Sequence, residues 1–195
     1  MLFTIAGEAA LSQISDVAVE PGSAGRIVSE LYARHATALY AFGRRLGLDE
    51  DEAWDAVQEA HLRLWRALAA GQDIHDHRAW AAAATYRLAM DQHRLTRRLT
   101  ELRRRLSPGS RPGSGPASGD GHGADRTDAL AAWAAVDALP LRQRAAIYLH
   151  YRLDLPFEDV GRAMGISAGS ARMSASRGLA TVRLSLGVAD EGADR

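Results

Sequence analysis

The sequence predicts an all-α protein of two small helical domains joined by a flexible linker, with a helix-turn-helix in the second domain. Three observations support this fold class. Apolar residues recur at helical spacing in both halves of the chain, and no segment alternates as strands do. Residues 107–126, SPGSRPGSGPASGDGHGADR, are too rich in glycine, proline and serine to form a core. Near the C-terminus, a short helix, a glycine and a capped second helix follow one another.

The bulk composition limits the kind of protein. The chain has 195 residues, enough for one large or two small domains, and it has no cysteine, which excludes disulfides and thiolate metal sites. No apolar run is long enough to cross a membrane, and the first residues lack the basic start of a signal peptide. We therefore expect a cytoplasmic protein without membrane insertion, which begins with a mobile arm over residues 1–25.

The first domain, residues 26–106, is predicted to contain three helices. The first runs from about residue 26 to 46, where Gly47 ends it, and the second is opened by Asp49 and closed by Gly71. The third is an uninterrupted stretch over residues 78–106. The inner face of the first helix is expected at Ile27, Leu31, Leu39, Phe42 and Leu46. The inner face of the second is expected at Ala53, Val57, Ala60, Leu64 and Leu68. In the third helix, apolar residues alternate with the arginines at Trp80, Ala84, Leu88, Leu95, Leu99, Leu102 and Leu106.

Charge is segregated within this domain although the net charge of the chain is zero. Residues 49–59 contain six acidic side chains and no basic one, whereas residues 87–106 contain seven arginines against two acids. One face of the third helix carries Arg87, Arg94, Arg98 and Arg105, with the aromatic Trp80 and Tyr86 upstream. Basic groups beside exposed rings are what single-stranded DNA requires, and we prefer this interpretation to a solvated basic helix that only balances the acidic one.

The second domain, residues 127–186, is predicted to hold helices over residues 127–138 and 141–153, then the helix-turn-helix over residues 155–183 and a polar tail from residue 187. Gly165 should end the first helix of the motif, Ile166 should fill the turn and Ser167 should cap the second helix. Short polar groups and arginines on an outward face suit a groove of duplex DNA. The candidate DNA-binding residues are Ser167, Ser170, Arg172, Met173, Ser174, Ser176 and Arg177.

Other chemistries find little support in the sequence. His75 and His77 could be read as metal ligands, with His61 or His35 nearby, but solvated loop histidines explain the pattern more simply. No glycine-rich phosphate loop, nucleophile motif or carboxylate pair stands out. We therefore expect no enzyme activity, no metal, no cofactor and no small-molecule substrate.

The order of these parts resembles the sigma factors of bacterial RNA polymerase, in their compact extracytoplasmic-function (ECF) group. The segment DEDEAWDAVQEAHLRLWRAL resembles the polymerase-binding helix of region 2, and HRAWAAAATYRLAMDQHRLTRR resembles the part of region 2 that melts and reads the promoter −10 element. The stretch ALPLRQRAAIYLHYRLDLPFEDVGRAMGISAGSARMSASRGLATVR resembles region 4, which reads the −35 element. Matching positions are Asp55, Gln58 and Glu59 for core polymerase, Trp80, Arg87, Asp91, Arg94 and Arg97 for the −10 element, and Arg172 and Arg177 for the −35 duplex.

The resemblance implies a transcription initiation factor whose partners are core RNA polymerase and promoter DNA. Tyr86 and Arg98, which are found with the basic residues of the third helix, are further candidates for contact with the −10 element. The chain departs from the family pattern at His61, which is a packing change, and at Leu88 and Ser174, which concern base contacts. The promoter sequence of the family therefore does not carry over, and an anti-sigma factor is a further possible partner. Two rival functions are a one-component regulator, with ligand-binding or dimerisation helices in residues 27–106, and a metal-dependent hydrolase at His75 and His77.

Overall fold

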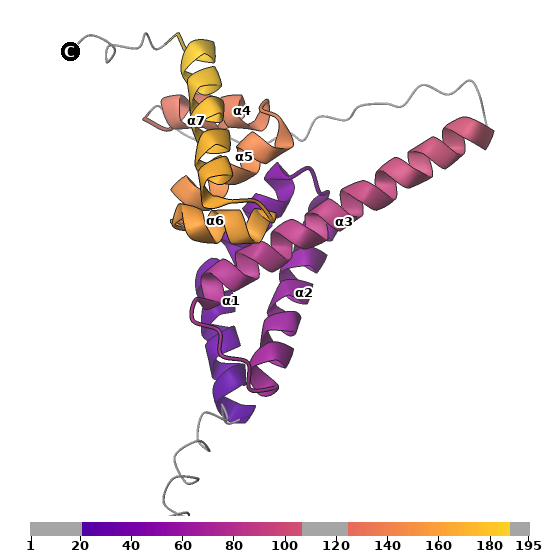
Figure 1. Ribbon diagram of the computed structural model, residues 1–195, viewed down its shortest axis with the longest axis vertical. Coiled ribbons are helices and arrows are strands. Elements are labelled where there is room, and N and C mark those ends of the chain that lie inside the picture. Colours follow the sequence, from indigo (N-terminus) through magenta and orange to yellow (C-terminus); the bar gives the residue numbers. More distant parts are fainter. Residues whose placement is uncertain (1–20, 107–124, 188–195) are drawn as a thin grey trace, which may run out of the picture.

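The computed structural model describes residues 21–106 and 125–187, and within them the chain is helical with no strand, which confirms the all-α fold class. The first domain consists of α1 (Pro21–Arg45), α2 (Glu50–Ala69) and α3 (His77–Leu106). The second consists of α4 (Asp125–Asp137), α5 (Leu141–Ile147), the π-helical segment η1 (Tyr148–Arg152), α6 (Phe157–Met164) and α7 (Ala168–Ser185) (Figure 1). The expected arm over residues 1–20, the linker over residues 107–124 and the tail from residue 188 lie outside the described residues.

Local signals explain where the first helices begin and end. The expectation that the arm extends to residue 25 is wrong, because α1 begins at Pro21, where the fixed φ of proline suits a first helical turn. At α2, Asp49 accepts a hydrogen bond from the backbone N–H of Glu52, whose side chain accepts one from the N–H of Asp49. The five residues expected on its inner face are all buried.

The two halves of α3 have different surroundings. Its first half lies against α1 and α2 and buries a run of small residues between Ala81 and Ala89. Its second half projects away from the other helices (Figure 1), and about half or more of the side-chain surface is exposed at Leu95, Leu99, Leu102 and Leu106. Helical spacing predicted the helix correctly, but these four leucines do not contribute to the core.

The helix-turn-helix forms as predicted. Gly165 adopts the left-handed conformation at the end of α6 (φ 67°), and Ser167 accepts a hydrogen bond from the N–H of Ser170, 3.1 Å away. Upstream, the single helix expected over residues 141–153 is instead an α-helix that continues into the π-helical segment η1. Likewise, α4 begins at Asp125, two residues inside the expected linker.

The two domains pack against each other. α6 lies on α3, and Tyr148 of η1 reaches α1, where its ring stacks on Phe42 at 5.2 Å and its hydroxyl donates to the carbonyl of Ala38 at 3.1 Å. Arg45 at the end of α1 pairs with Asp137 of α4 at 2.5 Å. The two domains are therefore held together by a buried contact as well as by the covalent connection between them.

Gly161 is predicted to be the least replaceable glycine of the helix-turn-helix. A Cβ there would lie 2.8 Å from the carbonyl oxygen of Ile166, which is backbone in the turn and cannot move aside. We expect Gly161→Ala to lower the free energy of unfolding by about 1–3 kcal/mol, measured by thermal and urea denaturation. Gly169→Ala is the matched control, since a Cβ at that helical position meets nothing within 4 Å and should be neutral or slightly stabilising. Equal stability of the two variants would contradict the close-approach argument.

Candidate polymerase and DNA interfaces

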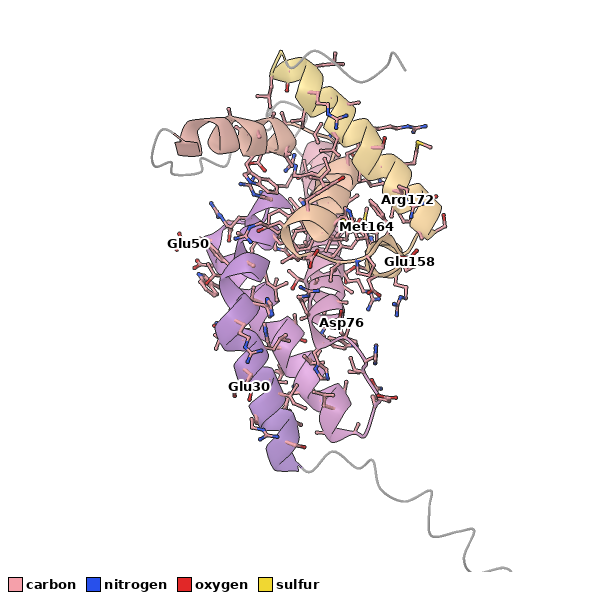
Figure 2. All side chains as sticks on the ribbon, turned by 90° about the vertical axis from the view of Figure 1, so that its left-hand side faces the viewer. Glu30, Glu50, Asp76, Glu158, Met164 and Arg172 are labelled. Atoms are coloured by element: carbon pink, nitrogen blue, oxygen red, sulfur yellow. The ribbon has the colours of Figure 1, made fainter. Side chains whose placement is uncertain are left out.

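The second helix of the motif, α7, presents the predicted DNA-binding residues on one open face. Ala171, Ala175 and Val182 are buried against the domain, which fixes the rotation of the helix. Arg172 extends from the other side (Figure 2), with its guanidinium carbon 5.2 Å from the ring centroid of Phe157. This cation–π contact orients the side chain while leaving it exposed. The other exposed members of the face are Ser170, Met173, Ser176 and Arg177.

Three serines of this face have local hydrogen-bond partners. Ser167 caps α7 and its hydroxyl also lies 2.9 Å from that of Ser170. Ser174 donates to the carbonyl of Ser170 at 2.9 Å. A serine hydroxyl has only one proton, so in this arrangement Ser174 can offer solvent or DNA an acceptor but no donor.

The predicted polymerase-binding residues lie on the outer face of α2. Asp55 and Gln58 are exposed, while Glu59 is partly covered and accepts from Arg63 at 2.7 Å. The same face also exposes 41% of Leu62 and 41% of Trp65, neither of which was predicted to bind polymerase. The spacing of the sequence indicates this placement, because Leu62 follows Asp55 by seven residues and Gln58 by four, and Trp65 follows Gln58 by seven. The exposed Trp65 favours a protein-binding surface here, because aromatic side chains are enriched at protein interfaces.

The predicted −10 residues are divided by the packing of the two domains. Arg87, Asp91 and Arg94 line a cleft of about 320 Å³ whose opposite wall is Met164 and its neighbours at the end of α6. Arg94 pairs with Asp91 at 2.5 Å, so part of the positive charge is neutralised within the cleft. By contrast, Arg97 and Arg98 are exposed further along α3, and Trp80 packs partly buried against the core.

Tyr86 differs from the expectation of an exposed ring. Only 7% of the residue is exposed in this arrangement, and burial raises the pKa of its hydroxyl. Helical spacing placed Tyr86 on the basic face, but only the structure reveals that α6 lies beside that face. Tyr86 lines the same cleft as Met164 of α6, and its ring is too deeply buried in this arrangement for a base to stack on it.

The histidines form no metal centre in the described part of the chain, where no cluster of three or more His, Asp or Glu side chains could hold an ion. His75 is exposed in the loop between α2 and α3. His61 is buried in α2, its Nδ1 2.7 Å from the carbonyl of Val57, and burial lowers the pKa of its ring. Nor does any helix among residues 21–106 and 125–187 have the length and apolar character to span a membrane.

Comparison with known proteins identifies the class. Residues 31–99 match the family model of sigma-70 region 2, and residues 129–182 match that of sigma-70 region 4. Similar curated proteins include the ECF RNA polymerase sigma factor SigE of Mycolicibacterium smegmatis, 27% identical over 79% of this chain, and the probable ECF sigma factor SigI of Mycobacterium tuberculosis, 28% identical over 77%. The chain covers 59% and 52% of the lengths of those relatives.

Solved structures with the same fold span both domains. The sigma factor RpoE of Bartonella quintana, in complex with the anti-sigma factor NepR, matches with a TM-score of 0.62 at 21% identity, over 82% of this chain and 96% of that one. CnrH, in complex with the cytosolic domain of CnrY, matches with a TM-score of 0.55 at 20% identity, over 86% of this chain and 94% of the other. The chain belongs to the sigma-70 family, in its ECF group.

Proposed function

We propose that this protein is a transcription initiation factor that binds core RNA polymerase and directs it to specific promoters. The observation that carries the proposal is the presence of region 2 and region 4 in order, each with a polar face on a helix whose other side is fixed by the core. In this role the protein itself catalyses no reaction and needs no cofactor. Its place of action is the cytoplasm, where polymerase meets the chromosome.

The division of labour follows the chemistry of each face. The acidic, partly apolar face of α2 suits a basic protein surface, and Asp55, Gln58 and Glu59 are its proposed contacts with core polymerase. The face of α7 suits the major groove, where an arginine can donate to guanine O6 and N7 together. The basic face of α3, with Trp80 at its start, suits the phosphates and bases of a melted −10 strand.

Region 4 also explains why a one-component regulator is not favoured. The helix-turn-helix of such a regulator would have to bind duplex DNA without polymerase. However, residues 156–183 carry only a small positive surplus, with four arginines against two carboxylates. Arg162 is already paired with Asp159. Few phosphates can be neutralised by so small a surplus, which gives weak binding and a shallow dependence on salt.

The polymerase contact can be tested by charge reversal on α2. We expect Asp55→Arg with Glu59→Arg to abolish binding to core polymerase, since unpaired interfacial charges cost on the order of 2–5 kcal/mol. Binding is measured by pull-down and by fluorescence titration, with helix content followed by circular dichroism. Glu30→Arg with Asp73→Arg makes the same charge change at exposed sites away from this face and should bind normally. Unchanged core affinity in the Asp55/Glu59 variant would remove α2 from the interface.

Arg172 is predicted to read a base and not only a phosphate. On polymerase holoenzyme, Arg172→Ala should cost about 1–3 kcal/mol at one −35 position and relax selectivity there. Binding to a panel of single-base variants of the −35 element measures the effect. Arg183→Ala, exposed on the last turn of α7, serves as control. A loss of equal size on every −35 sequence would make Arg172 a phosphate contact instead.

The free protein is predicted to bind promoter DNA poorly. Its net charge is zero, α6 covers part of the α3 face, and joint binding of both domains needs a scaffold that raises their effective concentration. By fluorescence anisotropy near physiological salt, we expect a Kd weaker than about 1 µM alone, and about 100-fold tighter binding with core enzyme. Tight, sequence-specific binding by the free chain would favour the one-component regulator.

A crosslink isolates the contribution of domain packing to this weak binding. The native chain has no cysteine, so Met90→Cys with Met164→Cys places the only two thiols on opposite walls of the α3–α6 cleft. A disulfide or short bismaleimide bridge should prevent promoter opening, and reduction of the disulfide should restore it. Each single-cysteine variant is the control. Full activity of the bridged protein would show that the packed arrangement does not block initiation.

A further inference from the structure

A second cleft between the two domains, of about 510 Å³, lies on the α1 side of the interface. α1 contributes Arg34, His35 and Arg45 to its wall, the start of α3 contributes Arg78, and the end of η1 contributes Arg152. None of these residues belongs to the proposed polymerase-binding or DNA-binding faces. The volume is in the range of small-molecule sites.

The arginines of this cleft are only partly neutralised. Arg45 pairs with Asp137 at 2.5 Å, and Arg34 makes a long, exposed contact of 3.9 Å with Glu30. Arg78 donates to the backbone carbonyl of Asp154 at 3.1 Å, and in the described part of the chain neither Arg78 nor Arg152 forms an ion pair with a carboxylate. The only acid among the lining residues is Asp154. The cleft therefore carries an excess of positive charge.

His35 in the wall of the cleft has a pKa that depends on its burial and on these arginines. Burial, followed by the charges of Arg78 and Arg34, lowers the pKa of His35, while Asp76 opposes the effect. A lowered pKa favours the neutral imidazole, which can donate one hydrogen bond and accept another without adding to the charge.

The remaining wall is aromatic and well anchored. Tyr148 and Trp133 line the cleft, and the Tyr148 hydroxyl is fixed by its bond to the carbonyl of Ala38. The π-helical turn of η1 ends at Arg152 and is followed by Asp154 with a positive φ of 50°. Wide turns of this kind are frequent at functional sites, and here the turn places Arg152 of the second domain in the same cleft as Arg34 and Arg78 of the first.

We propose that this cleft binds a small anion with two or more phosphate groups, such as pyrophosphate or the diphosphate of a nucleotide. Guanidinium groups donate paired, charge-assisted hydrogen bonds to phosphate oxygens, and three arginines that come from two domains can surround one polyphosphate. Because both domains contribute, the anion stabilises the packed arrangement over the separated one. The bound ligand thus opposes exposure of the α3 face.

Isothermal titration calorimetry of the full chain with pyrophosphate and, separately, with GDP tests the proposal at constant ionic strength. We expect saturable 1:1 binding of pyrophosphate, with a rise in Tm that grows with ligand concentration. Arg78→Ala with Arg152→Ala should weaken binding about tenfold or more, since it removes two charge-assisted donors. Tighter binding of GDP than of pyrophosphate would support the site and show that the base adds contacts within the cleft.

The control is Arg66→Ala with Arg183→Ala, which removes the same charge from exposed sites outside the cleft. It should keep the wild-type affinity. Because Arg78 also touches Asp154, the exposed Arg34→Ala variant provides a second test that does not disturb packing, with an expected loss of a few-fold. Absence of saturable binding, or an equal loss in the control variant, would overturn the site. The result is independent of core polymerase binding, so it stands or fails separately from the proposed function.

Discussion

Tyr148 provides the contact on which the arrangement of the two domains depends. Its ring is 2% exposed, stacks on Phe42 and lies 5.5 Å from the ring of Trp133, while its hydroxyl has a partner in Ala38. Burial of a phenol costs free energy unless the hydroxyl is hydrogen-bonded, and here the acceptor comes from the other domain. Tyr148, the most buried aromatic side chain of region 4 in the described structure, is therefore buried against region 2. The position of α6 on α3 and the arginine-lined cleft on the other side follow from this docking.

The second feature that shapes the molecule is the segregation of charge at zero net charge. The acids are concentrated at the start of α2 and the arginines along α3, and the structure neutralises several arginines locally, as with Arg94 and Asp91 or Arg105 and Glu101. Exposed pairs of this kind contribute little to stability, and they are easily exchanged for stronger contacts with a phosphate. The arrangement favours interaction with an oriented partner over general attraction to nucleic acid. This is consistent with a factor that reads DNA only when polymerase presents it.

Sequence reasoning found the parts whose causes are local. The start of α2 at Asp49, the left-handed Gly165, the Ser167 cap and the inner face of α2 each depend on residues a few positions apart, and all are present. It missed what depends on contacts distant in sequence. Periodicity placed Tyr86 and the α3 leucines on faces of a helix, but it could not show that Tyr86 is buried beside the α3–α6 cleft or that the leucines are exposed. The π-helical turn likewise has no local signature, because it accommodates packing against α1.

The domain packing has an energetic consequence for function. The surfaces that hold the domains together, above all α3 with α6, overlap the surface proposed to meet the −10 strand, so the same atoms cannot serve both at once. A partner shifts such an equilibrium only by the difference between its affinities for the two states, and moving it from 1:99 to 99:1 requires about 5.5 kcal/mol. In the proposed function, polymerase would supply this difference by binding the separated form more tightly than the packed one. A polyphosphate in the arginine-lined cleft acts in the opposite direction, because it binds only where both domains meet. The fraction of protein in the separated, DNA-binding form would then depend on how strongly polymerase prefers that form and how strongly a polyphosphate prefers the packed one. The total amount of the protein would not need to change.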